Sequence, residues 1–132
     1  MPLFQPVPEA VEKICTQCVD AAIQVHKALG PGFKEVIYVR AFCLELDSRG
    51  IPFESEKKIL VRYRTWEIPG QRVDLLVAGV LLVEIKSIPK IRKIHHSQVI
   101  SYLKTLNFRL GLILNFNKSV LKAGIKRVTR FD

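Results

Sequence analysis

The sequence has no long uninterrupted apolar run and no recognisable export leader. Its uncharged apolar stretches are well short of the ~20 residues that cross a membrane, although 48% of the 132 residues are hydrophobic. The first eight residues contain three prolines and no basic residue, unlike the basic start and continuous apolar segment of a signal peptide. We therefore expect a cytoplasmic protein that does not enter a membrane.

Cysteine is scarce. The three cysteines, Cys15, Cys18 and Cys43, are an odd number in a chain without an export leader, so we expect reduced thiols and no disulfide. Cys15 and Cys18 form a C-x-x-C pair, but a zinc site needs two further ligands at suitable spacing and none is found. Two small apolar residues one turn apart on a buried helix face explain the pair better.

Acidic residues almost disappear from the second half of the chain. Between Leu75 and Phe131 the only acid is Glu84, against eleven Lys or Arg, and the formal net charge of the chain is +9. This imbalance favours a polyanionic partner such as nucleic acid, because binding to phosphates releases counterions. A solvated basic surface that only keeps the protein soluble is the alternative.

The length suits one domain over residues 1–132, with 1–7 expected to be flexible and 118–132 expected to form a basic tail. Apolar periodicity predicts three helices, over residues 8–29, 34–49 and 95–107. The first would bury Val11, Ile14, Cys15, Cys18, Ala22, Val25 and Leu29, and the second would bury Val36, Ile37, Ala41, Cys43 and Leu44.

Strands are predicted over residues 51–63, 73–77, 81–86 and 108–116, with a short edge strand over 125–128. Residues 64–70 are interpreted as a turn region. It contains the only tryptophan, Trp66, which we expect to be a partly buried anchor, although an exposed Trp could stack on a base.

The two central strands are apolar except for Asp74, Glu84 and Lys86. Side chains alternate along a strand, so Leu82, Glu84 and Lys86 share one face. Charged groups in a buried strand are costly unless they are paired or bind a metal. The alternative, an exposed edge-strand ion pair between Glu84 and Lys86, is hard to reconcile with the apolar character of residues 81–85.

The register of this hairpin decides whether Asp74 joins Glu84. A two-residue loop, 78–79, places Asp74 opposite Val83, whereas a three-residue loop, 78–80, places Asp74 opposite Glu84 with Cβ atoms about 5 Å apart. We favour the second register because Gly79 can adopt the left-handed conformation that such a loop needs. The two carboxylates would then form an oxygen-rich site of the kind Mg²⁺ uses, beside Lys86.

The spacing of Asp74, Glu84 and Lys86, D-x₉-E-x-K, resembles the core motif of the PD-(D/E)XK nuclease superfamily. Residues 32–38, GFKEVIY, read G-x-x-E-x-x-Y, the string that names the small GxxExxY family within it. The segments VH (25–26), LGPG (29–32) and QVISY (98–102) are also similar to that family. The resemblance extends over roughly residues 10–129.

This resemblance implies an α/β fold with a restriction-endonuclease-like core, in which helices flank a central mixed sheet of four to five strands. It also implies a Mg²⁺- or Mn²⁺-dependent nuclease that hydrolyses phosphodiester bonds, of DNA more than RNA. Asp74, Glu84 and the Ile85 carbonyl would bind the metal, Glu35 would be a further ligand or water partner, and Lys86 would orient the attacking water. Gln98 and Tyr102, one helical turn apart so that their polar ends can meet, would contact phosphate or position Lys86.

Backbone contacts to nucleic acid are expected from Lys90, Arg92 and Lys93, and His26 is expected near the active cleft. Glu35 and His26 could instead simply complement the dipoles of their helices. The main alternative to an enzyme is a non-cleaving nucleic-acid-binding or regulatory module on the same fold, and a homodimer would widen the cleft of such a small domain. A protein-interaction module is disfavoured by the basic charge.

Overall fold

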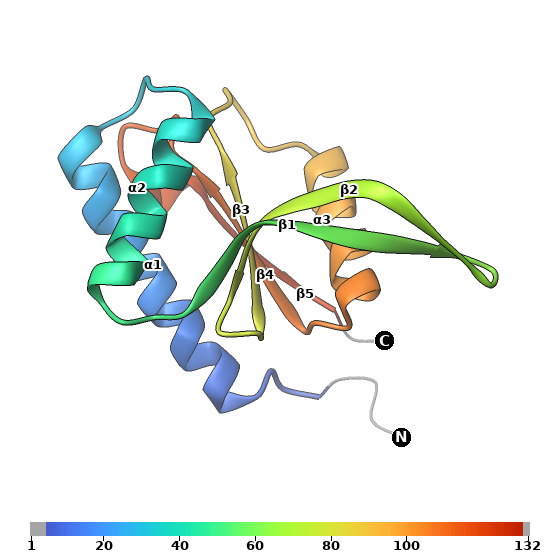
Figure 1. Cartoon of the computed structure of the whole chain (residues 1–132). Coiled ribbons are helices and arrows are strands. Elements are labelled where there is room, and N and C mark those ends of the chain that lie inside the picture. The colour runs from blue at the N-terminus through green and yellow to red at the C-terminus, as the bar shows by residue number, and fades with distance from the viewer. Residues whose placement is uncertain (1–4, 131–132) are drawn as a thin grey trace.

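The structure, a computed structural model, describes residues 5–130 (Figure 1). Residues 1–4 of the segment expected to be flexible (1–7) are outside the described range. Residues 131–132 of the expected tail are also outside it. The elements follow in the order α1 (Glu9–Leu29), α2 (Glu35–Ser48), β1 (Phe53–Tyr63), β2 (Trp66–Val77), β3 (Leu81–Lys86), α3 (Lys93–Leu106), β4 (Leu110–Asn115), the short 3₁₀ helix η1 (Leu121–Gly124) and β5 (Ile125–Thr129).

The five strands form one mixed sheet in the order β1-β2-β3-β4-β5. Only β3 and β4 are parallel, and α3 provides the crossover that a parallel pair requires; the other neighbours are antiparallel. The predicted mixed α/β sheet is confirmed. Most of the expected basic tail is not a tail, because η1 and the edge strand β5 complete the fold.

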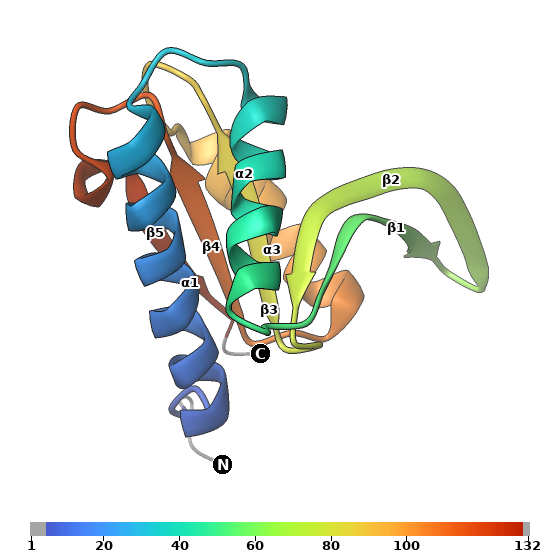
Figure 2. The same cartoon turned by 60° about the vertical axis from the view of Figure 1, so that its left-hand side comes forward.

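Helices cover both faces of the sheet. Figures 1 and 2 show α1 and α2 on one face and α3 on the other. Leu81, Val83 and Ile85 of β3 pack in the core under α1 and α2, whereas Leu82 packs with Val99 and Leu103 of α3. The predicted alternation along β3 is therefore confirmed, and Glu84 and Lys86, which share the parity of Leu82, are on the α3 face.

Helix α1 buries most of the predicted stripe, with Ile14 and Leu29 half-buried, but α2 does not bury its own. Cys15 and Cys18 are buried free thiols of α1, which agrees with a packing role. In α2 the buried residues are Tyr38, Phe42 and Leu46. Of the residues expected inside, three are exposed and two are half-buried: Val36, Ile37 and Leu44, and Ala41 and Cys43.

The prediction failed because apolar residues occur all around α2, so their spacing does not select one face. Burial of the larger aromatic side chains removes more apolar area from water. Within residues 5–130 no helix is long and apolar enough to cross a membrane.

The predicted turn over residues 64–70 is wrong. The chain turns at residues 64–65, and Trp66 already belongs to β2. Strands β1 and β2 pair out to Tyr63 and Trp66, so they form a long hairpin, hereafter the arm (residues 59–71), which projects from the body (Figures 1 and 2). Trp66 is 59% exposed, not the partly buried anchor that we expected.

Candidate active site

The β2–β3 hairpin has the register that brings the two acids together. Val77 pairs with Leu81 and Leu75 with Val83, so the loop has three residues, 78–80, as predicted. Gly79 has the expected positive φ of 68°, and Ala78 also has a positive φ, of 53°. The turn is closed by a hydrogen bond from the Val80 N–H to the Val77 carbonyl, at 3.1 Å.

Asp74 and Glu84 lie where the β2–β3 backbone pairing ends. The Asp74 N–H donates to Glu84 Oε2 at 2.7 Å, and the Ile85 N–H donates to Asp74 Oδ2 at 2.8 Å. Each carboxylate therefore binds a backbone amide of the opposite strand. The other two oxygens, Asp74 Oδ1 and Glu84 Oε1, accept no hydrogen bond from any residue that the structure describes.

The environment of this pair disfavours negative charge. Glu84 is 5% exposed, and burial, followed by the charge of Asp74, raises the pKa of Glu84 to about 7. Burial also raises the pKa of Asp74, against the opposing effects of the Ile85 N–H and of Lys86. A buried and a half-buried acid with too little positive charge around them are typical of a functional site, and a bound cation would stabilise their ionised forms.

Lys86 and Glu35 are close enough to act electrostatically on both acids. Lys86 lowers and Glu35 raises the pKa of Asp74 and of Glu84. Glu35 is the first residue of α2, and its Oε2 accepts a hydrogen bond of 3.3 Å from the N–H of Ser87, directly after β3. The four predicted residues thus converge from β2, β3 and α2 on the carboxyl end of β3.

Glu35 lies near the acid pair but does not form a compact group of three with it. Among residues 5–130 no group of three or more His, Cys, Asp or Glu side chains is close enough to hold a metal ion. The role of Glu35, as a further ligand or as a water partner, stays a prediction.

The G-x-x-E-x-x-Y string forms the support for Glu35. Gly32 has a φ of 113°, which favours glycine. The Tyr38 hydroxyl donates to the Gly30 carbonyl at 2.6 Å and accepts from the Phe33 N–H at 3.1 Å, so it fixes the loop before α2. Ser87 Oγ donates to the Phe33 carbonyl at 2.9 Å and joins this loop to the end of β3.

Tyr102 lies beside the acid pair, but Gln98 makes no hydrogen bond to Tyr102. Asp74 and Glu84 both raise the pKa of Tyr102, after burial as the main cause. Its hydroxyl accepts a hydrogen bond from Gln71 Nε2 at 2.9 Å, whereas Gln98 is exposed and has no hydrogen bond within the described residues. The predicted meeting of Gln98 and Tyr102 is therefore wrong, and Gln71 of β2 takes that place. Sequence spacing gives no signal for Gln71, since the contact joins two distant elements.

The predicted basic connector is exposed and follows the site directly. Lys90, Arg92 and Lys93 are all exposed, between the end of β3 and the first turn of α3. The buried side chain of Asn115 holds the start of this connector, since it accepts from the Ile88 N–H at 3.1 Å and donates to the Ile88 carbonyl at 2.9 Å. This role of Asn115 was missed, although a polar residue at the end of an apolar strand is a usable signal.

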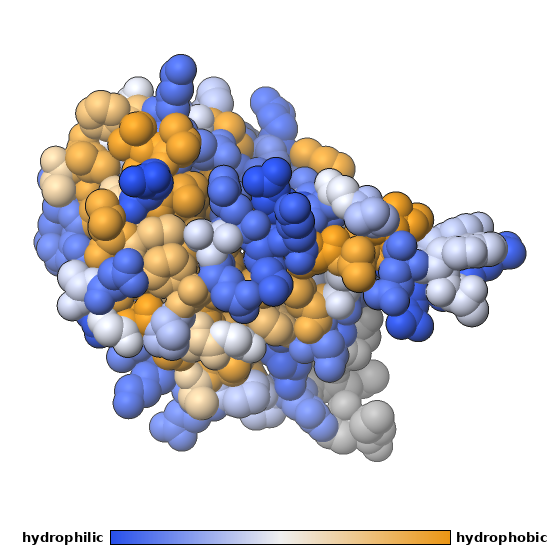
Figure 3. Space-filling model, in the orientation of Figure 1, coloured by the Kyte–Doolittle hydropathy of each residue, from blue (hydrophilic) through white to orange (hydrophobic). Residues whose placement is uncertain are grey.

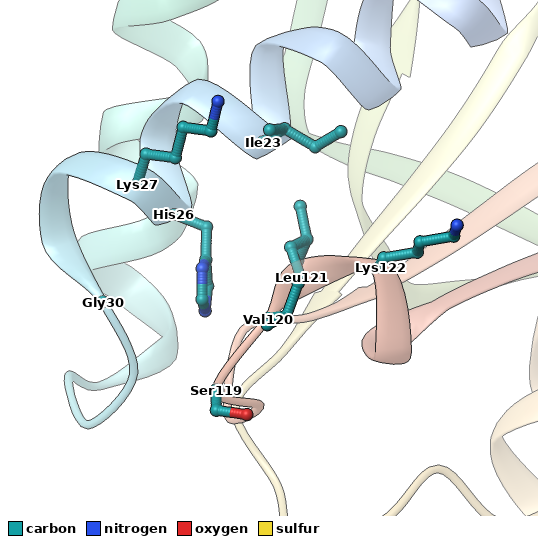
Figure 4. Close-up of a pocket in the computed structure, with 8 residues that line it drawn as sticks. All are labelled: Ile23, His26, Lys27, Gly30, Ser119, Val120, Leu121 and Lys122. Carbon is teal, nitrogen blue, oxygen red and sulfur yellow. The ribbon is translucent and has the colours of Figure 1, made fainter.

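His26 packs against the segment that follows β4, and its predicted place near the active cleft stays a prediction. His26 is 7% exposed, and its Nε2 is 2.7 Å from the Lys118 carbonyl oxygen. Figure 4 shows the ring pointing from α1 toward the segment that carries Ser119 and Val120, at a hollow of about 380 Å³. No carboxylate lines this hollow. Its burial and its hydrogen bond favour a structural role over contact with nucleic acid.

The donor set fits a hard divalent cation. Mg²⁺ is commonly bound by one or two carboxylates and keeps several waters, so two carboxylate oxygens without hydrogen bonds are sufficient. The Lys86 carbonyl accepts from the Phe116 N–H at 2.9 Å on the β4 side. Because successive carbonyls of a strand point to opposite edges, that of Ile85 points to the β2 side, toward Asp74, as its predicted ligand role requires.

The comparisons with known proteins agree with this geometry. The family model described as the PD-(D/E)XK nuclease superfamily matches residues 12–128. No curated protein and no solved structure is a significant match for the chain. The matched range includes all five strands except the last residue of β5, and it includes Asp74, Glu84 and Lys86. The chain belongs to the PD-(D/E)XK nuclease superfamily.

Proposed function

We propose that this protein is a metal-dependent nuclease that hydrolyses phosphodiester bonds in nucleic acid, DNA more than RNA, with Mg²⁺ or Mn²⁺ bound by Asp74 and Glu84. The observation that carries the proposal is the acid pair itself. The buried Glu84 and the half-buried Asp74 each accept a backbone hydrogen bond from the other's strand through one oxygen, and the second oxygen of each accepts none from any described residue. The G-x-x-E-x-x-Y string supports membership of the GxxExxY branch, and we expect the protein to act in the cytosol.

The residues divide the chemical work. Asp74 Oδ1, Glu84 Oε1 and the Ile85 carbonyl are the groups that would hold the metal. A bound divalent ion makes a water nucleophilic at neutral pH and offsets the charge that develops on the phosphate. Lys86, one position beyond Ile85, is placed to orient the attacking water or to stabilise that charge.

Other groups bind and position the substrate. Tyr102, held by Gln71, presents its hydroxyl beside the acids, where it can contact a phosphate or position Lys86. Lys90, Arg92 and Lys93 would bind the nucleic-acid backbone without reading bases. A homodimer is part of the proposal, and the exposed apolar residues Val36, Ile37 and Leu44 of α2 are the surface that would support it.

A non-cleaving binding or regulatory module is the second candidate. The observation in its favour is that no group of three acidic or other metal-binding side chains gathers within residues 5–130. Against it, a protein that only binds nucleic acid has no need of the buried Glu84 beside Asp74, an arrangement that costs stability when both acids ionise.

The test compares cleavage of single-stranded and duplex DNA and RNA with Mg²⁺ or Mn²⁺ by the wild type, Glu84→Ala and Lys86→Ala. We expect each substitution to reduce the rate on the order of 100-fold or more, with Glu9→Ala, an exposed acid of α1, as the matched control at wild-type rate. Mn²⁺ should also raise the melting temperature of the wild type but not of Asp74→Ala.

Two outcomes would contradict the enzyme. Cleavage that survives both Glu84→Ala and Lys86→Ala would belong to another site or to a contaminant. Tight, salt-sensitive binding with no cleavage by the wild type would favour the regulatory module.

A further inference from the structure

The arm carries a strip of exposed apolar and aromatic side chains. Val61 pairs with Ile68 and Tyr63 pairs with Trp66, and side chains of directly paired residues, or of residues two apart on one strand, are on the same face. All four are between 39% and 59% exposed. Figure 3 shows hydrophobic residues beside hydrophilic ones over the arm, at the right of the view.

The tip of this strip is an aromatic stack. The rings of Tyr63 and Trp66 lie 5.9 Å apart with an interplanar angle of 19°. Both side chains are more than half exposed, so the stack presents ring faces to solvent. Flat, exposed aromatic faces are the platform on which unpaired bases stack, with little dependence on base identity.

The charge around the stack is net positive. Residues 60–68 include Arg62, Arg64 and one acid, Glu67, which pairs with Arg62 across the hairpin. The Arg64 guanidinium lies 5.4 Å from the centroid of the Tyr63 ring. Nearer the body, Lys57 and Arg72 are paired with Glu54 and Glu56. The tip is thus suited to phosphate groups next to stacked bases, whereas like charges would oppose the meeting of two such tips.

The arm is continuous with the active site. Trp66 and Asp74 belong to the same strand, eight residues and at most roughly 26 Å apart at the rise of an extended strand. A register shift separates Val61 from Ile59. At the base of the arm, Ile59 is buried in the core that contains Tyr102, and its partner Gln71 donates a hydrogen bond to the Tyr102 hydroxyl. A nucleic-acid strand bound at the tip would therefore extend along the strip toward the face that presents Asp74 and Glu84.

From this geometry we infer that the arm binds nucleic acid with unpaired bases, which stack on Tyr63 and Trp66 while Arg62 and Arg64 bind the neighbouring phosphates. This inference rests on the proposed function, for which it specifies the substrate class: single-stranded nucleic acid, or duplex with a single-stranded segment.

The experiment uses the fact that Trp66 is the only tryptophan, so fluorescence excited at the long-wavelength edge of tryptophan absorption, where tyrosine does not absorb, reports on the stack. Oligothymidylate, oligouridylate and a duplex of equal length are titrated into the full chain in EDTA, where no cleavage occurs. We expect quenching by the single strands and little by the duplex. Anisotropy of labelled oligothymidylate should show binding weakened about 5- to 100-fold in Trp66→Ala and less in Trp66→Phe, which keeps a ring.

Val120→Ala is the control, since Val120 is an exposed apolar residue, at 61% exposure, directly before η1 and far from the arm in sequence. Unquenched fluorescence, equal binding of duplex and single strand, or unchanged affinity in Trp66→Ala would each overturn the inference. The inference would also be overturned if sedimentation showed a dimer that Trp66→Ala abolishes while the affinity for oligothymidylate stays the same. The titration needs no metal, so it tests binding separately from cleavage. If the protein binds in this way but does not cleave, the proposed hydrolysis is wrong and the inference about the arm stands.

Discussion

At the scale of single residues, Glu84 is the most buried of the predicted acids. Its side chain accepts a hydrogen bond from the Asp74 N–H. A carboxylate in this position destabilises the protein when it ionises, because its charge is both desolvated and close to that of Asp74. Such a cost is accepted where the charge is needed for binding or catalysis.

This cost has a measurable dependence on pH. The pKa of Glu84 is about 7 in the folded protein and 4.5 ordinarily, so the folded state binds the proton more tightly than the unfolded chain. The contribution of Glu84 to stability therefore falls as the pH rises from about 4.5 to about 7. Glu84→Gln cannot ionise and keeps an acceptor for the Asp74 N–H. In EDTA it should raise the free energy of unfolding on the order of 2–3 kcal/mol near pH 8 and change it little near pH 4.

Urea unfolding at both pH values is the measurement, with Glu9→Gln as the exposed control that should change stability little at either. Equal stability of wild type and Glu84→Gln near pH 8 would show that the carboxylate is solvated. Addition of Mn²⁺ should reverse the order by stabilising the wild type alone.

At the scale of elements, the loop between α1 and α2 depends on one hydroxyl. The Tyr38 hydroxyl binds both the Gly30 carbonyl and the Phe33 N–H, while the Tyr38 ring stacks on Phe116 at 4.5 Å. Tyr38→Phe keeps the ring and removes both hydrogen bonds, so unfolding should become easier by about 1–3 kcal/mol. Hydrogen exchange of the Phe33 amide should become faster, and cleavage slower, as Glu35 loses its support.

Tyr63→Phe is the control for stability, since the Tyr63 hydroxyl has no hydrogen bond within residues 5–130 and its side chain is exposed. If Tyr38→Phe exchanges the Phe33 amide at the wild-type rate, the loop is held by its other contacts, such as that from Ser87.

The elements also show what sequence can and cannot predict. The hairpin register was predictable for two reasons. Gly79 can adopt the left-handed conformation that the three-residue loop needs, and charged residues in an apolar strand are costly unless they are paired or bind a metal. The buried face of α2 was not, because Val36, Ile37 and Leu44 are as apolar as the residues that tertiary packing selects. Nor was the length of the arm, since Pro69 and Gly70 indicate a turn inside what is the second strand of the hairpin, even though residues 66–68 alternate in polarity.

In the candidate site too, the local features were predictable from the sequence and those set by tertiary packing were not. Asp74, Glu84 and Lys86 come from one hairpin, so local rules place them together. The partner of Tyr102 depends on how α3 packs against β2, which spacing along one helix cannot reveal, and so Gln98 was predicted where Gln71 is found.

At the scale of the whole molecule, nucleic acid could bind through a few defined basic residues or through the general attraction of the net charge of +9. These two cases can be distinguished by experiment. Lys90, Arg92 and Lys93 lie between the site and α3, on the connector that Asn115 and Lys118 hold in place. If they bind phosphates, their joint replacement by Gln removes up to three counterions from the binding equilibrium. The slope of log Kd against log salt for single-stranded DNA should then fall by about 2.

Lys13, Lys27 and Arg40 provide the matched control for the connector. They are equally exposed and carry the same total charge, but they belong to α1 and α2, which cover the opposite face of the sheet from α3 (Figure 2). Their replacement by Gln removes the same net charge, so any general attraction to nucleic acid weakens equally in the two triple variants. We expect the control to keep nearly the full salt slope. Equal loss of slope in both variants would mean that the basic charge acts as a diffuse field, without a defined path for the nucleic-acid backbone past Asp74 and Glu84.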